Sequence, residues 1–202
     1  MADTGAPHFI PYVEPTDLVR DYPAADEASA FAVAAGLDAA GGLIAVKSAI
    51  FTGTRAQSNV AAGGNFAVND LEITHEVADP ANRLIISAFI GAAGSSSGDG
   101  DVGIAVSDGT SLIAVGASEG VRTVLTAGGR VVGFGTGDIG VVTMPSVTFV
   151  HTPGAGSKTY TVRAVNPTND TRTLFINRRE SDANSQPSVR AVSSLVIQEV
   201  KV

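Results

Sequence analysis

Short runs of alternating apolar and polar residues fill the chain from Leu43 onwards. In the segment 65–73, for example, Phe66, Val68 and Leu71 flank a polar pair. This period of two is the pattern of a strand that buries one of its faces. The runs predict strands at 43–51, 65–73, 83–90, 103–107, 111–115, 130–134, 146–150, 159–165, 173–177 and 194–202.

Turn-forming residues separate these runs at regular intervals. Asp108-Gly109, between two short apolar runs, predicts a hairpin. The glycine- and serine-rich segment 91–101 predicts a mobile, exposed loop. Many short strands without crossover helices favour an all-β domain over 43–202, a sandwich of the jelly-roll kind.

The last run, Ser194–Val202, gives the sharpest structural expectation. Its alternation places Leu195 and Ile197 on a buried face, and leaves Gln198 and Lys201 nearer solvent or a subunit boundary. A strand that continues to the last residue would tie the C-terminus into a sheet.

Residues 1–42 show no strand pattern and form a separate region. Four prolines exclude a helix interior from the segment 1–24. A disordered terminus is one interpretation, but disordered tails usually lack apolar clusters, which favours an extended arm that docks on another protein. The apolar side chains of this arm are Phe9, Ile10, Tyr12, Val13, Leu18 and Tyr22.

The segment 25–42 is rich in helix-forming residues and predicts one short helix. Asp26 and Glu27 suit its first turn, and the pair Gly41-Gly42 can end it. A helix of about four turns is marginal in water by itself, so it should pack on its own β domain or on symmetry-related copies. The side chains that share its apolar face are Ala30, Val33, Ala34 and Leu37.

Composition and charge exclude several classes of function. The chain has no cysteine, which removes disulfides, thiolate zinc sites and a cysteine nucleophile. Its net charge of −7, with scattered basic residues, argues against nucleic-acid binding. No apolar run is long enough to cross a bilayer, and the first residues lack a secretory signal pattern. We therefore expect a soluble protein made in a cytosol, with no membrane insertion.

Two motifs, one rich in glycine and one rich in acidic residues, resemble ligand sites in their residue types alone. The segment 135–140 matches a dinucleotide-binding pattern, but the residues after it cannot form the helix that such a site needs. Asp99 and Asp101 could supply oxygens to calcium, with Asp108 as a distant third, yet the spacing of a calcium loop is missing. We expect a glycine-rich turn and a solvated loop, with no cofactor.

Catalytic and metal-binding chemistry has equally weak support. His8, His75 and His151 are far apart in sequence, and none belongs to a pair with metal-ligand spacing. A polysaccharide depolymerase would use a pair of carboxylates in a groove. The sequence does not show which acids would form such a pair. We therefore predict no enzyme and no metal site. The acids considered are Asp70, Glu72, Glu76, Asp79, Glu119 and Asp138.

Three stretches of the β region resemble the C-terminal jelly-roll domains of tailed-phage fibre and head-fibre proteins. The segment 73–86 is similar to a polar turn followed by a buried strand, and 147–163 is similar to the penultimate hairpin of that family. The segments 174–178 and 193–200 are similar to its closing strands. Pro11–Pro23 also resembles N-terminal segments of minor tail or fibre proteins.

This resemblance implies a virion location, a homotrimer and attachment of the arm to other virion proteins of the head or tail. The apolar side chains of the arm would then make the attachment, and the apolar face of the helix would make trimer contacts. The family has no shared catalytic residues to carry over. A receptor- or glycan-binding module for host attachment is the alternative, and an enzyme is the third hypothesis.

Overall fold

The computed structural model describes residues 42–77, 79–96, 102–120, 122–129, 142–180 and 190–202. These residues form strands and turns, with no helix among them. The strands are β1 (Leu43–Phe51), β2 (Arg55–Val60), β3 (Asn65–Val77), β4 (Arg83–Phe89), β5 (Ala93–Ser95), β6 (Val102–Ser107), β7 (Leu112–Ile113), β8 (Ala127–Gly129), β9 (Ser146–His151), β10 (Gly156–Val165), β11 (Arg172–Ile176) and β12 (Ser193–Val200).

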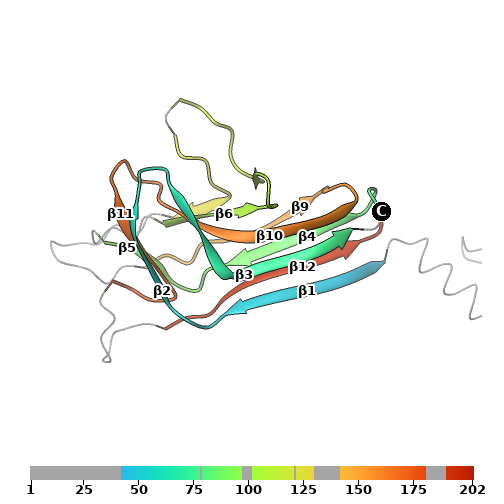
Figure 1. The fold of residues 1–202 in the computed structure, drawn as a ribbon, viewed down its shortest axis with the longest axis horizontal. Coiled ribbons are helices and arrows are strands. Elements are labelled where there is room, and N and C mark those ends of the chain that lie inside the picture. The colour runs from blue at the N-terminus through green and yellow to red at the C-terminus, as the bar shows by residue number, and fades with distance from the viewer. Residues whose placement is uncertain (1–41, 78, 97–101, 121, 130–141, 181–189) are drawn as a thin grey trace, which may run out of the picture.

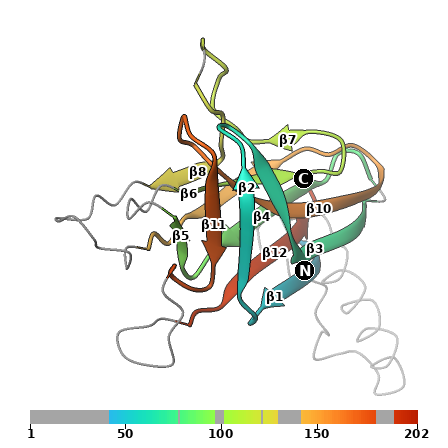
Figure 2. The same cartoon turned by 60° about the vertical axis from the view of Figure 1, so that its left-hand side comes forward.

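Three antiparallel sheets account for these strands. Sheet A has the order β1-β12-β4-β9, and sheet B has the order β3-β10-β6-β7, with β8 also paired to β6. A smaller end sheet has the order β2-β11-β5. The long strands run along the molecule, and the end sheet closes one end (Figure 1). In a view turned by 60°, β2 and β11 run across the long strands (Figure 2).

Sheets A and B share one apolar core. Alternate residues of each strand point inward, as Leu84 and Ile86 do from β4 and Val162 does from β10, and all three are fully buried. Burial of a side chain of this size contributes about 1.5–3 kcal/mol. The structure is therefore an all-β domain with antiparallel sheets packed as in a β-sandwich.

The alternation along the terminal strand predicted its burial correctly. Leu195 and Ile197 are fully buried, Gln198 is half-buried and Lys201 is exposed. β12 lies between β1 and β4, so it is a central strand of sheet A. Its position explains the strict period of two, because one face of this central strand packs on the core and the other is turned outward.

Most predicted strands are present, with ends shifted by a few residues. The last strand was expected to reach Val202 but ends at Val200. β1 has the predicted bounds, and the hairpin at Asp108-Gly109 is confirmed by the pairing of β6 with β7. Gly109 has a φ of 89°, which a residue with a side chain rarely adopts. Sequence analysis missed β2, β5 and β8. The strand predicted at 130–134 lies outside the described residues.

Two predictions were wrong. Residues 92–95, expected in an exposed loop, are buried, because β5 pairs with β11 in the end sheet and small side chains allow close packing there. The segment 147–163 is not a hairpin: β9 pairs with β4 in sheet A, whereas β10 pairs with β3 and β6 in sheet B. The connection between β9 and β10 therefore crosses from one sheet to the other.

Candidate functional sites

Many of the residues singled out from the sequence lie outside the described part of the chain. The arm residues and the helix face fall within 1–41, as does His8. Asp99, Asp101 and the glycine motif at 135–140 also lie outside it. The predictions about these residues stay predictions.

Three buried polar side chains meet where β3, β12 and the β3–β4 connection come together. Nε2 of His75 lies 2.7 Å from Oε2 of Glu199, and Nδ2 of Asn82 donates to Oε1 of Glu199, also at 2.7 Å. No side chain of the three is more than slightly exposed. Because β3 belongs to sheet B and β12 to sheet A, Glu199 ties the two sheets together.

This cluster has the features of a structural joint. Each carboxylate oxygen of Glu199 has a partner, which offsets the cost of burying the group. Nδ1 of His75 is buried and has no hydrogen-bond partner among the described residues. A nucleophilic site would need a hydroxyl or thiol within reach of that nitrogen. The geometry therefore supports a role in holding the sheets together.

A second cluster lies between the end of β9 and the start of β10. The rings of His151 and Tyr160 meet edge to face, with centroids 5.9 Å apart and an interplanar angle of 81°. The Tyr160 hydroxyl and Nε2 of His151 are buried, without a hydrogen-bond partner among the described residues. Nζ of Lys158 lies 4.0 Å from Oδ2 of Asp108.

The protonation states in this cluster follow from burial and from Asp108. Burial lowers the pKa of the His151 imidazole, although the charge of Asp108 opposes the shift. Burial, with a contribution from Asp108, raises the pKa of Tyr160 to about 12. A hydrogen bond from the backbone N–H of Ser111 lowers the pKa of Asp108. At neutral pH these shifts favour a neutral imidazole and phenol beside an ionised carboxylate.

The two clusters lie at the same end of the sandwich. Glu199 pairs with Leu84, and Leu84 pairs with His151, so the three form one row across sheet A. In sheet B, Lys158 pairs with His75. Residues opposite one another on paired strands point to the same face. This polar end of the core therefore carries ionisable side chains.

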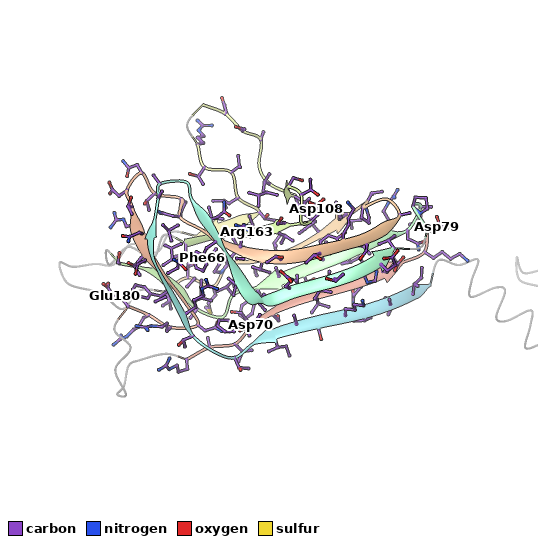
Figure 3. The ribbon with its side chains drawn as sticks, in the orientation of Figure 1. Phe66, Asp70, Asp79, Asp108, Arg163 and Glu180 are labelled. Atoms are coloured by element: carbon purple, nitrogen blue, oxygen red, sulfur yellow. The ribbon has the colours of Figure 1, made fainter. Side chains whose placement is uncertain are left out.

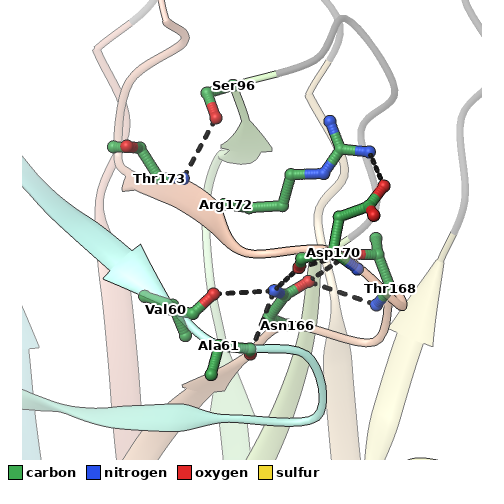
Figure 4. A network of polar contacts seen from close by, with 8 residues as sticks. All are labelled: Val60, Ala61, Ser96, Asn166, Thr168, Asp170, Arg172 and Thr173. Atoms are coloured by element: carbon green, nitrogen blue, oxygen red, sulfur yellow. Dashed lines mark hydrogen bonds and ion pairs between the residues drawn. The ribbon is translucent and has the colours of Figure 1, made fainter.

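At the opposite end, a buried asparagine joins two turns (Figure 4). Nδ2 of Asn166 donates to the carbonyl oxygens of Val60, Ala61 and Asp170 at 2.8–3.1 Å. Its Oδ1 accepts from the backbone N–H of Thr168 at 3.1 Å. Asn166 therefore holds the β2–β3 turn against the β10–β11 turn.

An open groove of about 580 Å³ lies beside these joined turns. Ala62, Gly63 and residues 167–169 form one wall, and Arg122 and Thr123 form the other. Arg122 makes an ion pair with Glu119 at 2.7 Å, on an exposed loop. Hydroxyl, amide and guanidinium groups make this groove suitable for a polar ligand.

Three of the acids considered for catalysis have a hydrogen-bond or ion-pair partner among the described residues. Glu72 accepts a hydrogen bond from Thr161 at 3.0 Å, Glu119 pairs with Arg122, and Asp79 accepts from the backbone N–H of Ala81. Asp70 and Asp79 lie far apart along the molecule (Figure 3). Asp138 lies outside the described residues.

No protein-family model matches this chain, and a comparison with curated proteins finds no relative. Among the described residues, no three histidine or acidic side chains are grouped closely enough to hold a metal ion. That part of the chain also contains no helix with the length and apolar character of a membrane span.

The structurally important asparagines were missed by sequence reasoning. Asn177 has a φ of 58°, and its Nδ2 donates to the carbonyl oxygens of Phe51 and Gly53 at 2.8 and 3.0 Å. It follows β11 directly, just as Asn166 follows β10. An asparagine immediately after an apolar run was the available signal, since asparagine tolerates positive φ and bonds to nearby backbone groups.

Proposed function

We propose that this chain is a structural protein of a phage virion, in which a trimeric jelly-roll domain is displayed on the particle through the N-terminal arm. The observation that carries the proposal is the order in which the strands pair. The resemblance of the closing strands to phage fibre and head-fibre domains adds the virion location.

The strand pairs are nested in the way a rolled-up antiparallel ribbon requires. The outermost pair is β1 with β12, followed by β3 with β10, β4 with β9, and β6 with β7. Successive pairs alternate between sheet A and sheet B. This order, with four main strands in each sheet and β8 added to sheet B, supports a jelly roll.

Jelly rolls serve viral coat proteins and sugar-binding domains, so the fold alone does not select one function. The segments 174–178 and 193–200, which carry much of the family resemblance, include β12 and most of β11. The titratable residues at the polar end of the core join the sheets, which supports a structural role in preference to an enzymatic one.

Immunolabelling of particles tests the virion location directly. An antibody raised against residues 43–202 should label purified particles of the phage at regular positions on the head or the tail. Host lysate without particles is the control for non-specific labelling. Particles that carry no label, although the protein is expressed, would contradict the proposal.

Deletion of residues 1–24 tests the role of the arm. The buried core cluster of the described residues runs from Phe51 to Ile197, so the truncated protein should keep its β-type circular dichroism. It should no longer incorporate into particles. Normal incorporation would show that attachment does not depend on the arm.

Host attachment through a receptor or glycan is the second candidate function, and the groove beside Arg122 is the observation in its favour. If this function holds, an Arg122→Ala variant should bind host cells or their surface polysaccharide more weakly than the wild type. A Lys201→Ala variant, far from the groove, is the matched control. Equal binding by all three proteins would argue against the groove.

A further inference from the structure

The polar end of the core contains three buried atoms that can hydrogen-bond but have no partner among the described residues. They are Nδ1 of His75, the hydroxyl of Tyr160 and Nε2 of His151. The side chains of His75 and Tyr160 are almost fully shielded from solvent. Buried polar atoms of folded proteins are nearly always bonded to a protein group or to an ordered water molecule. Three such atoms at one end of the core indicate a binding site for a small polar molecule.

Tyr160 lies next to both histidines. On the inner face of sheet B, Tyr160 pairs with Ile73. His75 is two residues further along β3, so it is the diagonal neighbour of Tyr160 on the same face. From sheet A, the ring of His151 meets the Tyr160 ring edge to face, with centroids 5.9 Å apart. The three atoms therefore belong to side chains that adjoin one another between the two sheets.

The contacts of Glu199 define what His75 requires. Both carboxylate oxygens of Glu199 accept hydrogen bonds, one from Asn82 and one from Nε2 of His75. With the proton on Nε2, a neutral imidazole has a free lone pair on Nδ1 and accepts a hydrogen bond there. The Tyr160 hydroxyl can donate and accept, and Nε2 of His151 does one or the other according to its tautomer. The shared partner must therefore be able both to donate and to accept.

Water is the small molecule that meets these requirements. A metal ion does not fit, because no three histidine or acidic side chains of the described residues are grouped closely enough to hold one. The negative charge of Asp108 acts on both His151 and Tyr160, which disfavours an anion beside them. Water is uncharged, donates two hydrogen bonds and accepts others. A buried water molecule typically makes about three hydrogen bonds in total.

We propose that the polar end of the core is an internal water-binding site, in which water bridges the Tyr160 hydroxyl and Nε2 of His151 and also bonds to Nδ1 of His75. The bound water connects the His75–Glu199 contact to the His151–Tyr160 ring pair, so one polar network spans both sheets. This inference goes beyond the proposed function and does not depend on it, because it follows from the buried atoms of the sandwich alone.

A high-resolution crystal structure of the full chain tests the site directly. Ordered solvent density should lie about 2.7–3.2 Å from each of the three atoms. A protein group bonded to any of them, from whichever part of the chain, would overturn the assignment. Well-ordered side chains without solvent density beside them would overturn it as well.

Tyr160→Phe provides a test in which the sign of the effect separates the alternatives. If water bonds to the hydroxyl, the substitution breaks that bond, and the midpoint of urea unfolding at neutral pH should fall. If the hydroxyl is buried without a partner, its removal relieves a desolvation cost, and the midpoint should rise. Ser146→Ala removes an exposed hydroxyl and is the control, with an unchanged midpoint expected. An unchanged or raised midpoint for Tyr160→Phe would contradict the proposal.

A double variant tests whether the same water serves both rings. His151→Phe keeps an aromatic ring at its position and removes Nε2. Each single variant should lower the urea midpoint, and the double variant should lower it by less than the sum, because the same bridge is lost only once. Additive losses would show that the two atoms share no water, and the bridge would be disproved. Circular dichroism checks that each variant is folded, and the crystal structure of the wild type gives its answer whether or not the variants fold.

Discussion

The two main sheets are alike on their inner faces and different on their outer faces. Inside, both carry fully buried aliphatic side chains. Outside, β3 of sheet B exposes Glu72, Thr74 and Glu76, whereas β1 of sheet A exposes Val46, Ser48 and Ile50 at the same two-residue intervals. The inner pattern is set by the shared core. The outer pattern differs, because β3 presents charged side chains and β1 presents apolar and small polar ones.

The sheets are also joined differently at the two ends of the sandwich. At one end, Glu199 of sheet A bonds to His75 of sheet B through charged or ionisable side chains. At the other end, Asn166 and Asn177 bond to backbone carbonyl groups of neighbouring turns.

The largest expected effect comes from breaking the joint between the sheets. His75→Ala leaves the Glu199 carboxylate buried with one of its two side-chain partners missing, which should cost about 3–5 kcal/mol. His151→Ala is the matched control at the same end of the core. It removes one ring contact and should cost about 1 kcal/mol. Urea unfolding measures both, and equal costs would show that the joint contributes nothing specific.

A second pair of substitutions compares the buried inner face of β12 with the exposed residue that follows this strand. Ile197→Ala removes a fully buried side chain from the central strand of sheet A and should cost about 2–5 kcal/mol through lost burial and a cavity. Lys201→Ala, at an exposed position, should cost no more than about 0.5 kcal/mol. Equal, small effects in denaturant melts would mean that β12 is not a core strand.

A spectroscopic measurement tests how deeply the inner face of sheet B is shielded from water. The pKa of Tyr160 is raised to about 12 because the phenol is buried near Asp108. In an absorbance titration of tyrosinate, one tyrosine should ionise near this pH, and Tyr160→Phe should remove that step. A wild-type titration completed near pH 10 would contradict the placement of the phenol.

The smallest expected effect is a pH dependence of stability at the polar end of the core. Burial lowers the pKa of His151, so the unfolded chain takes up this proton at a higher pH than the folded chain. Stability is therefore lost as the pH falls below about 6.5, the ordinary histidine value. Asp108, whose pKa is also lowered, contributes only at still lower pH.

Urea midpoints at pH 7.5 and pH 5.5 measure this effect. The wild type should lose more stability between the two conditions than a His151→Gln variant, which lacks the titrating group. An equal change in both proteins would assign the pH dependence to another residue.

The period of two predicted strands where a strand has one buried and one exposed face. It succeeded most clearly for β12, whose buried and half-buried residues alternate along its whole length. It failed for β5, whose three small residues are all buried and show no alternation. A strand of three residues carries too little pattern to be separated from a glycine-rich loop.

Sequence by itself determined the all-β class, the positions of most strands and the buried side of the last one, because these depend on local patterns of side chains. Tertiary structure decided which strands became neighbours, since the order of residues does not show which strands pair through hydrogen bonds. It placed His75 and Glu199 within 2.7 Å although 124 positions separate them.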